Sequence, residues 1–228
     1  MIDVVSIALS ALAVLIILPI HEFAHAYAAH KMGDDTAKNL GRLSLNPLRH
    51  FDPLGAFCMV FLHFGWAKPV PINPNNFRNY RKGCILTSAA GVLMNYVMAF
   101  LLYPVFVLVV AYVGPYFAGT YMENFLYVFF YAAFTYSLSF CVFNLLPFYP
   151  LDGFRIVDAV NTKRGKAFQF LRTQGHYVLL GLIAVHFLSS RVPYLGYIDV
   201  LGYVLNFAVG IFGRPINLFW NWILGLIF

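Results

Sequence analysis

The chain has 228 residues, of which 61% are hydrophobic and only 11% are charged. A soluble domain usually carries about a quarter charged residues, so this composition excludes an ordinary soluble protein and predicts one that lies in a membrane. The formal net charge of +6 does not indicate a nucleic-acid partner, because most Lys and Arg residues lie in two blocks between apolar runs, as membrane orientation explains. The three cysteines, Cys58, Cys84 and Cys141, have no C-x-x-C spacing, so neither a disulfide framework nor a thiolate zinc site is indicated.

Apolar runs long enough to cross a bilayer divide the chain. They cover residues 4–29, 84–113 and 124–147, with two less clearly bounded runs at 176–190 and 198–212. The pattern predicts an all-α polytopic membrane protein, folded as a single integral membrane domain over residues 1–228. It has a three-span catalytic core at about 4–153 and about two further accessory spans within 176–228. The N-terminus lacks the basic leader and cleavage site of a signal peptide, so the first run is expected to remain as a span.

The first run ends in a motif that carries chemistry, His21-Glu22-Phe23-Ala24-His25. An H-E-x-x-H pair on a helix places two imidazoles one turn apart on one face, where they can bind zinc while the glutamate acts as a base. Glu22 is the only acid in this run, and an ionisable group at membrane depth is costly unless it has a function or a partner. A helix-packing hydrogen bond between His21 and Glu22 is the alternative, but it leaves the spacing of His25 unexplained.

The segment at 51–77 does not follow the pattern of a span or of a soluble loop. Residues 54–66 are apolar yet too short to cross a bilayer, and the prolines of 68–74 exclude a helix and favour extended backbone. We expect a short re-entrant or β-like element here, whose unpaired backbone around Val70 to Ile72 could receive a substrate peptide as an added strand. A surface loop resting on the bilayer accounts for the same residues equally well.

Basic residues are distributed unevenly between the runs. The segment 31–82 carries eight, the loop 114–123 carries none, and the segment 155–172 carries five. The positive-inside rule places the first and third of these connections in the cytoplasm and the second outside. The ends of the first and third runs therefore converge on the cytoplasmic leaflet, and with them His21, His25 and Asp152.

The second and third runs contain polar residues of their own. Small residues from Ser88 to Gly91 open the second run and allow close helix approach, and Asn95 follows inside it. Packing across a helix interface is the simpler interpretation of Asn95. The third run ends in Asn144, two prolines and then Leu151-Asp152-Gly153, where the prolines stop the helix and Gly153 permits a sharp turn.

A catalytic zinc site needs a third protein ligand and an open position for water. His30 is a poor candidate, because five residues beyond His25 it is rotated by about 140° around the helix. The other candidates fall into two groups: loop residues, for which a solvated face is the default, and histidines that more often serve in packing. These are Asp34, Asp35 and His50 in the first group and His63, His176 and His186 in the second. Asp152 is the best placed, as the one acid in an apolar, proline-fixed turn at the matching leaflet.

The three motifs together resemble the site-2 proteases, a family of intramembrane zinc metalloproteases. They are the H-E-x-x-H at His21 to His25, the stretch from Gly91 to Asn95, and the stretch from Asn144 to Gly153. The resemblance implies one Zn²⁺ per chain bound by His21, His25 and Asp152, with Glu22 as the catalytic base. It also implies substrate-binding or supporting roles for Asn144 and Asn95. The chain is similar to the compact bacterial branch without PDZ or CBS domains, which implies the bacterial inner membrane.

The expected function is hydrolysis of peptide bonds within or near transmembrane segments of membrane protein substrates. The partners would be a transmembrane protein or peptide and the lipid bilayer, and no oligomeric state is indicated. Two alternatives stay open. One is an ion or proton transporter with intramembrane His, Glu and Asp residues, and the other is a catalytically inactive relative that binds transmembrane partners. Residues 214–228 are expected to form an interfacial or partly inserted helix, and the sequence does not decide whether it spans.

Overall fold

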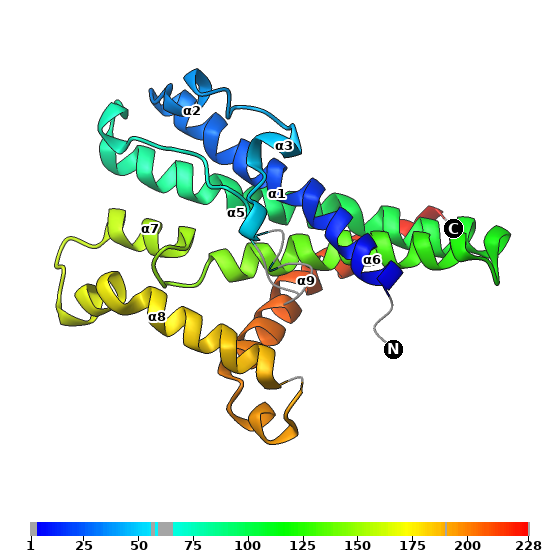
Figure 1. The fold of residues 1–228 in the computed structure, drawn as a ribbon. Helices are drawn as coiled ribbons and strands as arrows, with labels where there is room; N and C mark the ends of the chain where they lie inside the picture. Colours follow the sequence, from blue (N-terminus) through cyan, green and yellow to red (C-terminus); the bar gives the residue numbers. More distant parts are fainter. Residues whose placement is uncertain (1–3, 56–57, 59–65, 190, 228) are drawn as a thin grey trace.

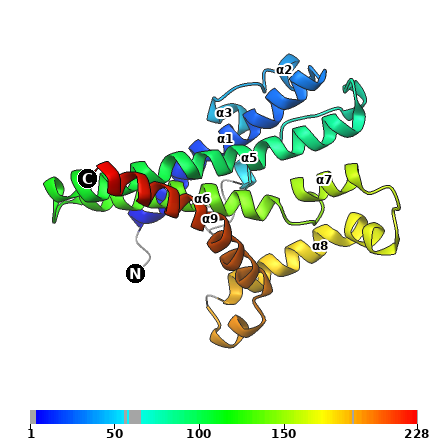
Figure 2. The same cartoon turned by 180° about the vertical axis from the view of Figure 1, so that it is seen from behind.

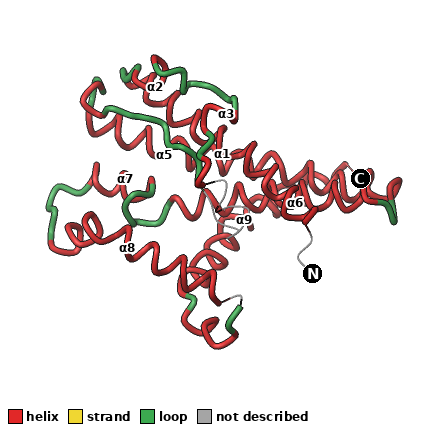
Figure 3. The backbone as a smooth tube through the Cα atoms, viewed as in Figure 1, coloured by secondary structure: helices red, strands yellow, loops and turns green. Residues whose placement is uncertain are grey.

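The computed structural model describes residues 4–55, 58, 66–189 and 191–227. Among these residues helices predominate and no strand is present, as Figure 3 shows. The long helices are α1 (Val4–Met32), α5 (Tyr80–Leu108), α6 (Tyr121–Asn144), α8 (Lys166–Ser189) and α9 (Val200–Ile227). The shorter helical elements are α2 (Thr36–Asn39), α3 (Pro47–His50), η1 (Pro74–Asn76), η2 (Val109–Val113), η3 (Gly114–Phe117), α7 (Asp152–Val160) and η4 (Pro193–Ile198). The predicted all-α class is confirmed.

Three helices in the described part of the chain are long and apolar enough to cross a membrane. They cover Ile7–Met32, Tyr80–Phe117 and Tyr121–Asn144, which match the three predicted core spans. The second is a composite, because α5 continues through η2 and η3 before the chain turns. The helices α8 and α9 are not among the three, so the number of further spans stays a prediction.

The three candidate spans lie side by side and alternate in direction. In Figure 1, α1 and α6 run the same way and α5 runs opposite to them, so the end of α1, the start of α5 and the end of α6 lie at the same end of the bundle. The small residues Ala132 and Ala133 of α6 pack against Ala13 and Ile17 of α1. Small side chains let helices approach closely, which matters in lipid because apolar burial alone does not drive helices together.

The last helix, α9, packs against α5 and α6 through one apolar cluster. Ala99, Leu138 and Ile216 are its buried members, contributed by the three helices in turn. The hydroxyl of Tyr96 donates a hydrogen bond to the carbonyl of Phe212 across 3.3 Å. Seen from behind in Figure 2, the C-terminal part of α9 runs along the α5–α6 pair, whereas its first part turns away from them and forms a hairpin with α8.

The C-terminal part differs from the prediction in two ways. The helix α8 begins at Lys166, ten positions before the predicted apolar run, because Phe168 is buried and its ring stacks on that of Phe154 at 5.5 Å. Residues 200–227 form one helix and not a span followed by a separate terminal helix, although Pro215 lies inside it. A proline removes one backbone hydrogen bond, which neighbouring groups can compensate in membrane helices.

A length of non-helical chain, residues 67–73, lies across the end of α1, and we call it the strap. Its Val70 side chain is buried against Ala26 of α1 and Ala37 of α2. Because the described residues contain no strand, the predicted β-like element is not confirmed. Most of the predicted re-entrant segment at 54–66, with His63, lies outside the described residues.

Asp34 joins the strap to the end of α1. It is fully buried, and its carboxylate accepts hydrogen bonds from the backbone N–H groups of Thr36 and Asn73 and from the side chains of Thr36 and Asn76. The expectation that Asp34 lies on a solvated loop face is therefore wrong. Burial alone would raise the pKa of Asp34, but the hydrogen bonds from Thr36 and Asn76 outweigh it and hold the pKa below its ordinary value.

The lowered pKa of Asp34 makes a stability difference depend on pH. We expect Asp34→Asn to destabilise the protein at pH 7 by ~1–3 kcal/mol, because a buried charged acceptor is lost. The ionised form is favoured in the folded state, so its contribution is present above the ordinary pKa of 3.8 and is lost as the pH falls below it. The gap in Tm between wild type and Asp34→Asn should therefore narrow as the pH falls from 7 to below 3.8.

The matched control for this prediction is the neighbouring carboxylate. The side chain of Asp35 is 52% exposed and pairs with His30. Asp35→Asn should change Tm little, because exposed ion pairs contribute ~0–1 kcal/mol. A Tm gap for Asp34→Asn that stays constant down to pH 3 would contradict the assigned role of its carboxylate.

Candidate metal centre

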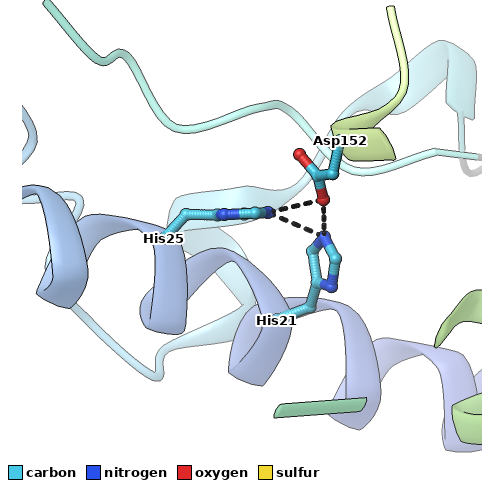
Figure 4. A group of neighbouring side chains, drawn as sticks. All are labelled: His21, His25 and Asp152. Carbon is cyan, nitrogen blue, oxygen red and sulfur yellow. Dashed lines mark hydrogen bonds and ion pairs between the residues drawn. The ribbon is translucent and has the colours of Figure 1, made fainter. Parts of the chain in front are cut away.

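Three side chains far apart in the sequence form what we call the His–His–Asp cluster, made of His21, His25 and Asp152. The Nε2 atoms of the two histidines lie 2.9 Å apart. Oδ2 of Asp152 lies 3.4 Å from Nε2 of His21 and 3.1 Å from Nε2 of His25. Figure 4 shows the imidazoles rising from α1 toward the carboxylate at the start of α7. All three residues are buried.

The dimensions of the cluster fit a small metal ion. Ligands held at 2.0–2.1 Å in tetrahedral geometry lie ~3.3 Å from one another, close to the three separations observed. Burial alone would raise the pKa of Asp152, but its contacts with His21 and His25 hold that pKa well below its usual range. A lowered pKa favours the ionised carboxylate, which is the form that binds a metal ion. Two imidazoles and one carboxylate are a donor set typical of catalytic zinc sites.

The second span fixes the protonation of one imidazole. Nδ1 of His25 lies 2.7 Å from the backbone carbonyl of Thr87. A carbonyl can only accept, so Nδ1 carries a proton, and in the neutral imidazole the lone pair is then on Nε2, the atom that faces the cluster. Thr87 could not be predicted from the sequence, because the contact is made by its backbone carbonyl, which every residue type has.

Gly91 lets α5 approach the cluster closely. A Cβ atom at this position would lie 2.3 Å from Nε2 of His25 and 2.6 Å from Cε1 of His21. These separations are far below van der Waals contact, and the neighbours are the candidate ligands themselves. The absence of a side chain at Gly91 therefore makes the cluster possible.

We expect Gly91→Ala to weaken zinc binding at least ~10-fold, the size of effect seen when groups that orient ligands are changed. The added methyl group must displace the imidazole of His25 or push α5 away from α1. Competition with a chromophoric chelator measures the zinc affinity. Gly181→Ala is the matched control, since a Cβ atom there meets nothing within 4 Å. Equal affinities for the two variants would contradict the close approach.

The position of Asp152 depends on the residue that follows it. Asp152 is the first residue of α7, and Gly153 packs so tightly that a Cβ atom would lie 2.2 Å from the carbonyl oxygen of Leu145. Gly153 was expected to permit a sharp turn. It is instead helical with an ordinary φ, and it serves the close approach of α7 to the end of α6.

Glu22 lies beside the cluster but is held by a different element. It is half-buried, and its Oε2 accepts a hydrogen bond of 2.8 Å from the backbone N–H of Val70 in the strap. The N–H that was expected to be free for a substrate strand is therefore engaged by the candidate base. Nothing in the residue types of the strap indicated this contact.

The remaining candidate ligands lie elsewhere in the described structure. His30 pairs with Asp35, Nε2 of His50 donates to the carbonyl of Ser44 at 2.7 Å, and His186 pairs with Asp199 at 2.8 Å. His176 packs its ring against those of Tyr149 and Tyr177. Within the described part of the chain, neither asparagine forms a hydrogen bond to the cluster. Asn144 donates to the carbonyl of Phe140 in its own helix, and Asn95 is fully buried without a hydrogen-bond partner among the described residues.

Comparison with known proteins gives two matches. Peptidase family M50 matches residues 109–188, a stretch that includes Asp152 but not His21 or His25. A protein of Bacillus subtilis (strain 168) named "Putative zinc metalloprotease YwhC" is 44% identical over 138 residues, which is 60% of this chain and 62% of that relative. The match thus spans less than two thirds of the relative's length. No solved structure matches the chain.

The two matches agree with the resemblance that the motifs indicate and with the donor set of the cluster. Family M50 is a family of peptidases, and the Bacillus relative is named for zinc and for proteolysis. The chain is therefore similar to peptidases of family M50 over residues 109–188 and to a protein named for zinc and proteolysis over 138 residues.

Proposed function

We propose that the chain is an intramembrane zinc metalloprotease that hydrolyses peptide bonds within or near transmembrane segments of other membrane proteins. One observation carries the proposal: the His–His–Asp cluster joins three ligand atoms within 2.9–3.4 Å, with the carboxylate of Glu22 on the adjacent residue of α1. His21, His25 and Asp152 would hold one Zn²⁺. When bound, the ion would polarise the scissile carbonyl and lower the pKa of a water molecule.

Glu22 would act as the general base and acid of the reaction. Its carboxylate takes a proton from the attacking water as the oxygen bonds to the carbonyl carbon. The carbon–nitrogen bond then breaks, and Glu22 returns the proton to the leaving amine. His25 holds its imidazole in one tautomer through Thr87, and the buried surroundings limit the approach of other nucleophiles.

The substrate class follows from where the cluster lies. His21 and His25 are in a helix apolar enough to cross a membrane, so a peptide that reaches them must come from lipid or from its boundary. The basic residues at the same end of the bundle support a site open toward the cytoplasm, in the inner membrane of a bacterium. Asn95, which follows Gly91 by one turn of α5, and Asn144 at the end of α6 would support the site or orient the substrate.

Reconstitution tests the proposal against the transporter alternative. The purified protein is placed in proteoliposomes with a single-span reporter peptide. We expect cleavage of the reporter to produce new termini, to stop after a chelator removes zinc, and to resume when zinc is restored. A transporter would instead carry an ion flux and leave the reporter intact. An inactive relative would bind the reporter without cleaving it.

A further inference from the structure

The strap contacts the candidate base through a single backbone group. Oε2 of Glu22 accepts the N–H of Val70 at 2.8 Å, although the two residues are 48 positions apart. The strap is not part of the His–His–Asp cluster, and the family comparison matches a different stretch of the chain. The hydrogen bond between Glu22 and Val70 is therefore not accounted for by the cluster or by the family match.

The local sequence makes Val70 a lone donor. It lies in Lys68-Pro69-Val70-Pro71-Ile72, where both flanking prolines lack an N–H, so Val70 carries the only backbone donor between Lys68 and Ile72. A residue before proline is excluded from the helical region, so the backbone at Val70 is restricted to extended conformations. The donor is thus isolated and has little conformational freedom.

The strap itself is fixed at both ends and in its middle. Nη2 of Arg42 donates to the carbonyls of Lys68 at 2.6 Å and of Pro69 at 3.3 Å. The N–H of Lys68 donates to the backbone carbonyl of His50 at 2.8 Å, and the N–H of Asn73 donates to the buried carboxylate of Asp34 at 2.7 Å. With the Val70 side chain buried, these contacts hold the Val70 N–H in one place relative to α1.

We propose that the strap is a positioning element for Glu22, and that the Val70 N–H fixes the carboxylate beside the His–His–Asp cluster. This inference rests on the proposed protease function. The bond occupies Oε2 and leaves Oε1 as the oxygen that can exchange protons with water. Among the described residues the Glu22 carboxylate accepts no other hydrogen bond, so without the strap its three side-chain torsions are free to turn the carboxylate away.

Amide hydrogen exchange tests the contact without activity and without metal. The prolines leave three backbone amides in residues 69–73, those of Val70, Ile72 and Asn73. In metal-free protein, Glu22→Ala should release one protected amide in this peptide, whereas Glu22→Gln should not, because its amide oxygen still accepts. Equal protection in the wild type and Glu22→Ala would overturn the proposal.

Cleavage kinetics test the role. Val70→Ala keeps the N–H and shortens the side chain, whereas Val70→Pro removes the N–H at a position whose extended backbone suits proline. We expect kcat of Val70→Pro to lie at least ~10-fold below that of Val70→Ala, with KM and zinc content unchanged, because a small misplacement of a reacting group costs up to ~100-fold. Equal kcat for the two variants would overturn the proposal.

A third variant tests the strap independently of whether Val70→Pro folds. Arg42→Ala loosens the strap by removing the hydrogen bonds to the carbonyls of Lys68 and Pro69, and it should also lower kcat while zinc content is kept. If the Val70 amide exchanged faster in Arg42→Ala while kcat stayed at the wild-type value, the hydrogen bond would be weakened without any effect on catalysis. That result would overturn the positioning role of the strap. If wild-type protein binds zinc and cleaves no reporter, the proposed function fails, and the exchange experiment still reports on the strap.

Discussion

Glu22→Gln is expected to retain about one zinc per chain and to lower kcat by ~10²–10⁴, the usual contribution of a general base. The amide of Gln has nearly the shape of the carboxylate, and its oxygen can still accept the N–H of Val70, so the local structure should persist. It cannot take a proton from water at neutral pH. Metal analysis of the purified variant and single-turnover cleavage of a reporter peptide measure the two quantities.

The matched control for Glu22→Gln is the other glutamate of the chain. Glu123 lies at the start of α6, at the opposite end of the bundle, where its Oε2 accepts the N–H of Gly119 at 2.8 Å. Glu123→Gln should leave both zinc content and kcat within about twofold of wild type, because surface changes of this kind have small effects. Loss of zinc in Glu22→Gln would mean that Glu22 is a ligand and not the base.

Sequence patterns predicted the three core spans because hydropathy over ~20 residues reports directly on burial in lipid. These patterns did not predict the helix boundaries that depend on tertiary packing. Residues 198–212 and 214–228 were predicted as separate elements, but residues 200–227 form one helix, in which Ile216 packs against Ala99 and Leu138. The helix α8 begins before the predicted apolar run, where Phe168 packs against Phe154. This is a tertiary interaction, which the hydropathy of a local run cannot predict.

The cluster was predictable to the extent that side chains define it. Helix geometry places His21 and His25 on one face, because they are four residues apart. The distribution of Lys and Arg between the apolar runs predicted that Asp152 lies at the same leaflet. The supporting contacts were not predictable from residue types. They are made by the carbonyl of Thr87 and the N–H of Val70, and such backbone groups are not specific to threonine or valine. Gly91 was noted for close helix approach, but that it faces the two imidazoles required the packing of α5 on α1.

Asp152→Ala is expected to remove zinc and to abolish cleavage. The variant leaves two histidines at the site, and a third protein ligand is typical of catalytic zinc centres. Changes to groups that merely orient ligands typically cost 10–100-fold in affinity, so loss of a ligand should cost more than ~100-fold. Chelator competition measures the affinity, and the reporter assay measures cleavage. Asp152→Ala also removes the contacts of the carboxylate with His21 and His25, so circular dichroism of the purified variant should accompany the zinc measurement to show that the fold survives.

Asp158→Ala separates loss of the ligand from loss of any acid on α7. Asp158 lies on the same helix and pairs with Arg164 at 3.5 Å and Arg172 at 3.9 Å, contacts between partly exposed groups that contribute ~0–1 kcal/mol. Its zinc affinity and kcat should match wild type. If Asp152→Ala bound zinc as tightly as Asp158→Ala, the His–His–Asp cluster would not be the metal site, because the two imidazoles alone do not account for such affinity.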